Sequence, residues 1–263
     1  MSSLGYKASF TDIYSAPDPR SYLRELSQYD YQVPQNALPW ILPQIPAGPP
    51  SDTNVLDLCC SYGFNAMLLN HSVSLWQLRA RYQDPALDEI TPETLINQDR
   101  EFYRSVRAPQ AEIRGLDISQ SAIDYAAGAG LLEAGWAENL EESAPSESLA
   151  EGIRGTQLIT CTGGISYITD KTITRVLECL ENPGEVRAAL FALRQFDMGP
   201  IQEAFARFGV RLERQPGAHL RQRTFVNEDE QAQAMEETER RGLDPTGLEA
   251  EGWYYADVFL TQS

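Results

Sequence analysis

Short apolar runs alternate with amphipathic stretches along most of the chain, a pattern typical of strands alternating with helices. A buried strand over 55–58 leads through a corner into an apolar helix over 64–70. The alternation continues from the run AEIRGLDIS (111–119) to the helix GPIQEAFARFG (199–209). This spacing indicates βαβ units, so the sequence predicts an α/β fold with a doubly wound, mostly parallel, Rossmann-like sheet. Between these runs we expect a helix capped by Ser119 or Ser121, strands at 135–140, 157–164 and 186–196, and a helix at 171–180.

The two ends of the chain depart from this alternation. Residues 1–50 are rich in tyrosine and proline, and short helices are expected around 20–28 before the Pro-rich run stops them. We interpret 1–50 as a helical N-terminal cap or lid and 51–263 as the main domain. At the other end, 210–227 and 252–262 look like a late antiparallel strand pair. The polar helix between them is most simply a solvated face.

A helical insertion at about 72–109 separates the first predicted strand from the second. It is longer than one helix and a turn require, and its pattern predicts helices at 74–83 and 91–106. Thr91 can cap the second of these, and Pro92 suits its first helical position. Such an insertion could shape a substrate pocket or a partner surface.

Composition narrows the function. The 263 residues are 42% hydrophobic, enough for one large core, and no run reaches the roughly 18 apolar residues of a membrane span. No secretory signal is visible, so a cytoplasmic location is expected. The formal net charge of −17 would repel polyanions. We therefore expect a small-molecule substrate, no nucleic acid and no membrane, with a homodimer as one option for assembly.

Metal and thiol chemistry is not indicated. The four cysteines include no CxxC pair, and we expect them to be reduced and mostly buried. His71 and His219 have no visible partner, and His71 is expected at the surface or as a helix C-terminal cap. No Ser-His-Asp or metal-ligand arrangement is found, so no metal is expected.

Acidic residues end two consecutive predicted strands. The stretch NVLDLCCSYGFNA (54–66) places Asp57 at a strand end, followed by Cys59, Ser61 and Gly63 at alternate positions, and RGLDIS ends the next strand at Asp117. Together with GWAENL, LITCTGGISYI and the late antiparallel pair, this order resembles class I S-adenosylmethionine (SAM)-dependent methyltransferases over roughly residues 50–262. The family's corner reads D-x-G-x-G-x-G, of which this chain keeps only the last glycine.

The resemblance implies SAM as the cofactor. Asp57 would position the ammonium of SAM, and Gly63 would let the chain turn into the helix. Cys59 and Ser61 are small enough for a tight corner with negative φ. Asp117 would accept hydrogen bonds from both ribose hydroxyls. The other expected cofactor contacts are Ile118, Trp136, Ala137, Glu138, Thr162 and Gly163, where Trp136 either stacks on adenine or packs in the core.

The loop TGGISYITD (162–170) follows the fourth strand, at the sheet edge where ligands of open α/β sheets bind. Tyr167, Ser166 and Asn139 are the candidate catalytic residues. Tyr167 could offer its ring face to the positive sulfur, and Asn139 or Ser166 could orient an amine. The lid could close over the site with Tyr14, Tyr22, Tyr29 and Tyr31.

Three functions fit these residues. The first is a SAM-dependent methyltransferase acting on a small molecule. The second is a cyclase that consumes SAM, as azetidine-2-carboxylate synthases do when the amine of SAM attacks its own side chain and expels methylthioadenosine. The third is a non-catalytic, methyltransferase-like binding protein. Retained SAM affinity separates the third from the others, and the sulfur-containing product separates the first two.

Overall fold

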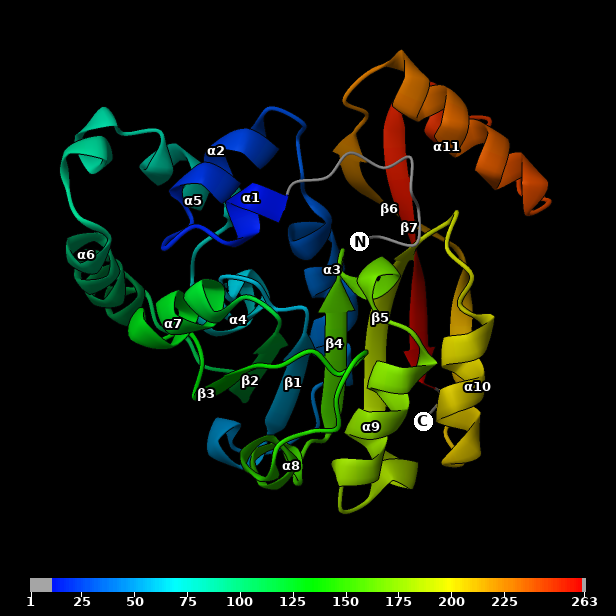
Figure 1. Cartoon of the computed structure of the whole chain (residues 1–263), viewed down its shortest axis with the longest axis horizontal. Coiled ribbons are helices and arrows are strands. Elements are labelled where there is room, and N and C mark those ends of the chain that lie inside the picture. Colours follow the sequence, from blue (N-terminus) through cyan, green and yellow to red (C-terminus); the bar gives the residue numbers. More distant parts are fainter. Residues whose placement is uncertain (1–10, 262–263) are drawn as a thin grey trace.

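A seven-stranded sheet with the order β3-β2-β1-β4-β5-β7-β6 forms the centre of the protein in the computed structural model, which describes residues 11–261. Five strands are parallel, β7 is antiparallel to β5, and β6 pairs antiparallel with β7 (Figure 1). The predicted doubly wound fold with its late antiparallel pair is therefore confirmed. The strands are β1 (Asn54–Leu58), β2 (Glu112–Asp117), β3 (Ala134–Ala137), β4 (Leu158–Thr162), β5 (Arg187–Leu193), β6 (Leu212–Thr224) and β7 (Trp253–Thr261).

Helices cover both faces of this sheet, and their buried residues form two main hydrophobic clusters. On one face lie α3 (Val33–Ile41), α4 (Phe64–Asn70) and α7 (Gln120–Gly128), and their cluster also includes residues of α1 (Thr11–Tyr14), α2 (Arg20–Ser27), α5 (Leu75–Tyr82) and α6 (Pro92–Ser105). On the other lie α8 (Glu147–Ile153), α9 (Asp170–Cys179) and α10 (Gly199–Arg207). The helix α11 (Glu228–Arg240) connects β6 to β7. Short 3-10 turns are η1 (Leu42–Gln44), η2 (Pro50–Asp52), η3 (Pro85–Glu89), η4 (Ile165–Tyr167), η5 (Pro183–Glu185) and η6 (Glu249–Glu251).

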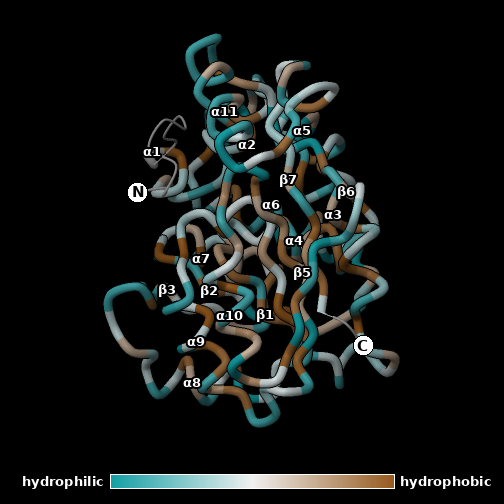
Figure 2. The backbone as a smooth tube through the Cα atoms, turned by 90° about the vertical axis from the view of Figure 1, so that its right-hand side faces the viewer, coloured by the Kyte–Doolittle hydropathy of each residue, from teal (hydrophilic) through white to brown (hydrophobic). Residues whose placement is uncertain are grey.

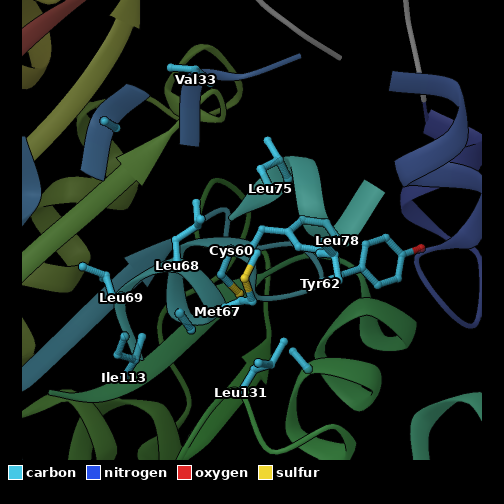
Figure 3. Close-up of a cluster of buried hydrophobic side chains, with 14 of the residues drawn as sticks. Val33, Cys60, Tyr62, Met67, Leu68, Leu69, Leu75, Leu78, Ile113 and Leu131 are labelled. Carbon is cyan, nitrogen blue, oxygen red and sulfur yellow. The ribbon is translucent and has the colours of Figure 1, made fainter. Parts of the chain in front are cut away.

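The N-terminal section shares its core with the corner after β1. Val33 of α3, Met67 and Leu68 of α4 and Leu75 of α5 are all buried and belong to one hydrophobic cluster, and Figure 3 shows Met67 and Leu68 in its centre with Val33 at its upper end. Hydrophobic residues gather along the central strands, and hydrophilic ones predominate in the surrounding loops (Figure 2). The division into a lid and a main domain stays a prediction, because one continuous cluster joins the two parts.

A buried carboxylate fastens the insertion to α7. Asp99 of α6 is fully buried and accepts hydrogen bonds from Arg81 (2.8 Å), from the Tyr82 hydroxyl and from the Tyr125 hydroxyl of α7 (2.8 Å). A buried charge is tolerated only when it is paired and hydrogen-bonded in this way. The helices predicted at 74–83 and 91–106 are both present, and Thr91 caps the second as expected.

Besides the single turn α1, two helices are not predicted by the sequence. The prolines were expected to stop helix formation, yet α3 holds Pro34 in its first turn and Pro39 in its interior. Burial of Val33, Ala37 and Ile41 outweighs the hydrogen bond that Pro39 cannot donate. The other is α8, which has a polar sequence. It begins after the N-cap residue Ser146, whose Oγ accepts a hydrogen bond from the Leu149 N–H at 3.1 Å.

Candidate functional site at the carboxyl edge of the sheet

The corner after β1 keeps a backbone path that normally requires glycine. Cys59 has φ 53°, Ser61 φ 48° and Gly63 φ 80°, so all three residues lie in the left-handed region. The expectation that Cys59 and Ser61 accept a corner with negative φ is therefore wrong. A non-glycine residue in this conformation costs about 1–2 kcal/mol, so contacts from the surrounding structure must hold it there.

Contacts from neighbouring strands stabilise this corner. The Ser61 N–H donates to Oδ2 of Asp117 at 2.9 Å, which joins the corner to the end of β2. The side chain of Cys59 fills the space in front of Gly164, where any Cβ would collide with it. The Cys59 thiol lies 3.7 Å from the Gly164 carbonyl oxygen. The side chain at position 59 is thus accommodated because position 164 has none.

Asp57 carries a carboxylate that is only half satisfied. Its Oδ1 accepts from Asn65 Nδ2 and from Thr160 Oγ1, each at 2.8 Å. Its Oδ2 is buried and has no hydrogen-bond partner within residues 11–261. Burial raises the pKa of the Asp57 carboxyl to about 7, and the two hydrogen bonds oppose this only in part. A cationic group at Oδ2 would favour the ionised form.

Asp117 ends β2, as the sequence predicted, and faces the same corner. Its Oδ1 accepts from the Ser119 N–H and its Oδ2 from the Ser61 N–H, both at 2.9 Å. Burial raises the pKa of this carboxyl above its usual value. Beside it, the Ile118 side chain is 74% exposed. An acid and an exposed apolar side chain thus stand together.

At the end of β3 the predicted adenine contacts Trp136, Ala137 and Glu138 are all half-buried. The Trp136 ring packs against Gly152 of α8, and its Nε1 donates to Ser148 Oγ at 3.1 Å. This is the core-packing alternative. The Glu138 carboxylate accepts from the N–H (2.9 Å) and Oγ of Ser146. Asn139 Oδ1 accepts from the Glu141 N–H at 3.0 Å, which leaves its predicted role untested.

The loop after β4 faces the lid. Gly163 has φ 79°, and a Cβ there would collide with the Tyr31 hydroxyl and lie 3.4 Å from Gln222 Nε2. Ser166 is buried in η4, whereas Tyr167 is 41% exposed. Thr162 Oγ1 donates to Asn65 Oδ1 at 2.9 Å, so Thr162 supports the side chain that holds Asp57. Gln222, on β6, was not foreseen as a site residue.

The segment 13–16, which we call the strap, lies over the corner and is held by three side-chain hydroxyls. The Tyr62 hydroxyl lies 2.8 Å from the carbonyl oxygens of both Ile13 and Ala16. Ser119 Oγ donates to the carbonyl of Tyr14 at 2.6 Å, and Ser121 Oγ donates to that of Ser15 at 3.0 Å. Figure 1 shows α1 and α2 on the side toward which the arrowheads of β1 and β4 point.

Of the four lid tyrosines, Tyr22 and Tyr31 are buried, and Tyr14 packs edge-on against Tyr22 with ring centroids 5.3 Å apart. The backbone carbonyl of Tyr29 accepts from the Thr224 N–H on β6 at 2.8 Å. The lid therefore contacts the corner, the β4 loop and β6 together.

One histidine agrees with the sequence expectation and the other does not. His71 ends α4 as a C-cap, as one alternative had it, but it is buried rather than at the surface. His219 does have a partner, because its Nδ1 lies 2.6 Å from Oδ1 of Asp257, which also binds Arg214 Nε at 2.6 Å. The pairing joins neighbouring strands, so no sequence pattern could reveal it. Within residues 11–261 no group of three or more His, Cys, Asp or Glu side chains could hold a metal ion.

Comparison with known proteins gives distant likenesses. No family model and no curated protein matches the chain. It is similar to the TehB-like SAM-dependent methyltransferase of Corynebacterium glutamicum, with 13% identity over 92% of this chain and 95% of that one and a TM-score of 0.44. The magnesium protoporphyrin IX methyltransferase of Synechocystis with bound SAM gives 12% identity over 98% and 88%, with a TM-score of 0.39. The phosphoethanolamine N-methyltransferase 2 of Haemonchus contortus gives 12% over 97% and 60%, with a TM-score of 0.46.

Likenesses at these scores assign neither a substrate nor a reaction to this chain. The strand order and the site's own geometry define the class: a doubly wound α/β protein with two acids, a left-handed corner and a glycine loop at one edge of the sheet. In the described part of the chain, no helix is long and apolar enough to cross a membrane.

Proposed function

We propose that this protein is a SAM-dependent methyltransferase that acts on a small molecule. The observation that carries the proposal is the unpartnered Oδ2 of Asp57, a buried carboxylate oxygen with no partner within residues 11–261. It lies beside a corner whose left-handed turns are kept although Cys59 and Ser61 stand at two of the glycine positions. Such an atom costs stability unless a ligand satisfies it. The ammonium of SAM would do so by a charge-assisted hydrogen bond.

The other groups at this edge fit the rest of the cofactor. Asp117 still has lone pairs for the ribose hydroxyls after accepting its two backbone hydrogen bonds. Ile118 would cover one face of the adenine ring. When bound, SAM supplies an electrophilic methyl group on its sulfonium. The protein would then place the acceptor in line with the methyl group and exclude water by closing the lid.

A small-molecule acceptor is favoured by the closure of the site and by the charge. The buried polar atoms Asp57 Oδ2 and Ser61 Oγ are inaccessible to solvent, and the strap is hydrogen-bonded across the corner. The net charge of −17 disfavours polyanionic substrates. One surface groove is lined by Arg81, Thr94 and Glu101, away from this edge, and another borders the strap at Ala16, beside Asp18 and Arg24.

The same closure favours the cyclase as a second candidate. An intramolecular attack by the amine of SAM needs a dry pocket and no second substrate, and the solvent-inaccessible polar atoms fit that requirement. In this candidate, Asp57 would lie beside the amine that attacks.

Mass spectrometry of the products tests both candidates. Purified protein is incubated with SAM alone and with SAM plus a low-molecular-mass metabolite extract, against boiled protein and an Asp117→Asn variant. S-adenosylhomocysteine that forms only with the extract supports methyl transfer. Methylthioadenosine formed from SAM alone supports the cyclase and refutes methyl transfer. Neither product, together with no SAM binding in a titration, refutes both.

A further inference from the structure

We propose that Gln222 faces the transferable methyl group and accepts a hydrogen bond from the acceptor, so that the site selects nucleophiles bearing an N–H or O–H. This inference rests on the proposed SAM site and names a specificity residue for it. Gln222 lies near the end of β6, which runs in the same direction as β1 and β4, because β7 is antiparallel to both β5 and β6. Its position therefore belongs to the edge that carries Asp57 and Gly163.

The side chain of Gln222 points at the β4 loop. A Cβ atom added to Gly163 would lie 3.4 Å from Nε2 of Gln222 and would collide with the Tyr31 hydroxyl. The Gln222 amide and the Tyr31 hydroxyl therefore both lie against Gly163. Gln222 is 2% exposed, and its Oε1 is buried without a hydrogen-bond partner in the described structure. A buried amide oxygen left unsatisfied is destabilising, so its retention points to a ligand. Gly163, in the left-handed region, lets the Tyr31 hydroxyl and the Gln222 amide approach the β4 loop, because a side chain at this position would collide with the Tyr31 hydroxyl.

The lid fixes the backbone around this residue. The Gln32 N–H donates to the carbonyl of Gln222 at 2.7 Å, and the Asn36 side chain donates to the carbonyl of Arg221 at 3.0 Å. These hydrogen bonds hold the backbone of Gln222 on one side, and the β4 loop packs against its side chain on the other. The side-chain amide of Gln222 is therefore pre-organised. Pre-organised polar groups are those that give specificity at low entropic cost.

A second buried glutamine provides the matched control. Gln195 follows β5, and its Oε1 is also without a partner among the described residues. Its Nε2, however, donates to Thr238 Oγ1 at 2.6 Å and to Glu249 Oε1 at 3.1 Å. Those two hydrogen bonds account for the burial of Gln195, whereas Gln222 has no side-chain hydrogen bond of this kind within residues 11–261.

Sinefungin tests the inference without a known acceptor, because in this SAM analogue a carbon bearing an amine replaces the methylsulfonium. Its amine therefore stands where the methyl group would be. Calorimetry gives Kd for sinefungin and for S-adenosylhomocysteine, which lacks any group there. We expect Gln222→Met to weaken sinefungin about 10-fold or more relative to S-adenosylhomocysteine, as loss of a hydrogen bond to a charged group does.

Two further variants fix the interpretation. Gln222→Glu, which can only accept hydrogen bonds, should retain or increase the preference for sinefungin, and Gln195→Met should leave it unchanged. An unchanged preference in Gln222→Met, with S-adenosylhomocysteine still bound, overturns the inference and leaves the SAM site standing. If wild-type protein binds neither ligand, the proposed function falls and the inference falls with it. Gln222→Met should not lower the melting temperature, because it removes an unsatisfied atom, so a folding defect would be visible separately.

Discussion

Replacing Asp57 by asparagine should stabilise the ligand-free protein and weaken its binding of SAM. Asparagine has the same shape, and its Oδ1 can keep the hydrogen bonds from Asn65 and Thr160. What it removes is the charge that burial disfavours. Stability and function are then expected to change in opposite directions at one residue.

The magnitude of the gain is set by the pKa. Burial raises the pKa of Asp57 from 3.8 in the unfolded chain to about 7 in the folded protein. Below pH 3.8 the carboxyl is protonated in both states and burial of its charge costs nothing, whereas the folded protein loses stability as the pH rises from there through about 7. At about pH 8 burial of the ionised carboxylate costs about 4 kcal/mol. At about pH 5.5 the folded carboxyl is protonated and the unfolded one ionised, so the cost is about half as much. Asp57→Asn should therefore gain up to about 4 kcal/mol at about pH 8, with a smaller gain at about pH 5.5.

Urea denaturation at the two pH values measures the stability, and calorimetry measures SAM binding. Loss of the carboxylate partner of the ammonium should weaken SAM about 10- to 100-fold. Wild-type affinity should rise as the pH increases through about 7, because free Asp57 must ionise to bind the ammonium. In Asp57→Asn this pH dependence should disappear.

Asp99→Asn is the matched control, since Asp99 is an equally buried aspartate that is paired with Arg81 and two tyrosines. Breaking that pair should destabilise the protein by about 3 kcal/mol and leave SAM affinity unchanged. If Asp57→Asn is destabilised at about pH 8 as Asp99→Asn is, Asp57 is a structural residue and the reasoning is wrong.

Three other substitutions probe the corner, the loop and the strap. Ser61→Gly should preserve stability and SAM binding because glycine suits φ 48°, whereas Ser61→Val should lose about 2 kcal/mol in thermal denaturation; equal stability of the two would contradict the left-handed corner. Gly163→Ala should lower the free energy of unfolding by at least about 1 kcal/mol and weaken the binding of SAM, because the added Cβ collides with the Tyr31 hydroxyl. An unchanged SAM affinity in calorimetry would argue against a role of this loop in binding. Tyr62→Phe removes the hydrogen bonds from the Tyr62 hydroxyl to the strap, so S-adenosylhomocysteine should dissociate about 2- to 10-fold faster in stopped-flow measurements. An unchanged dissociation rate would mean that the strap does not gate the site.

The local patterns of the sequence predict the order of the strands along the chain and most of the helices, with α3 and α8 as exceptions. Alternating apolar runs located β1, β2, β4 and β5, and Asp57 and Asp117 emerged as strand-end acids because that position depends only on where an apolar run stops. The helix over 64–70 was predicted with the bounds that the structure has. These features are decided by nearby residues, so the sequence carries them.

Features that depend on tertiary contacts could not be predicted in this way. Cys59 and Ser61 adopt left-handed conformations because Gly164 and Asp117, far away in sequence, accommodate them. Gln222 joins the site through the register of β6 with β7, and His219 finds Asp257 by the same register. A lone polar residue in a strand gives no signal of its partner, since pairing across strands is set by the whole sheet.

Calorimetric titration of the purified protein with SAM tests the central claim most directly. The account predicts saturable binding of one SAM per chain, with Kd below about 1 mM, the upper end of typical KM values, and a large loss of affinity in Asp57→Asn and in Asp117→Asn. No heat of binding up to about 1 mM SAM, with the protein folded, would contradict it.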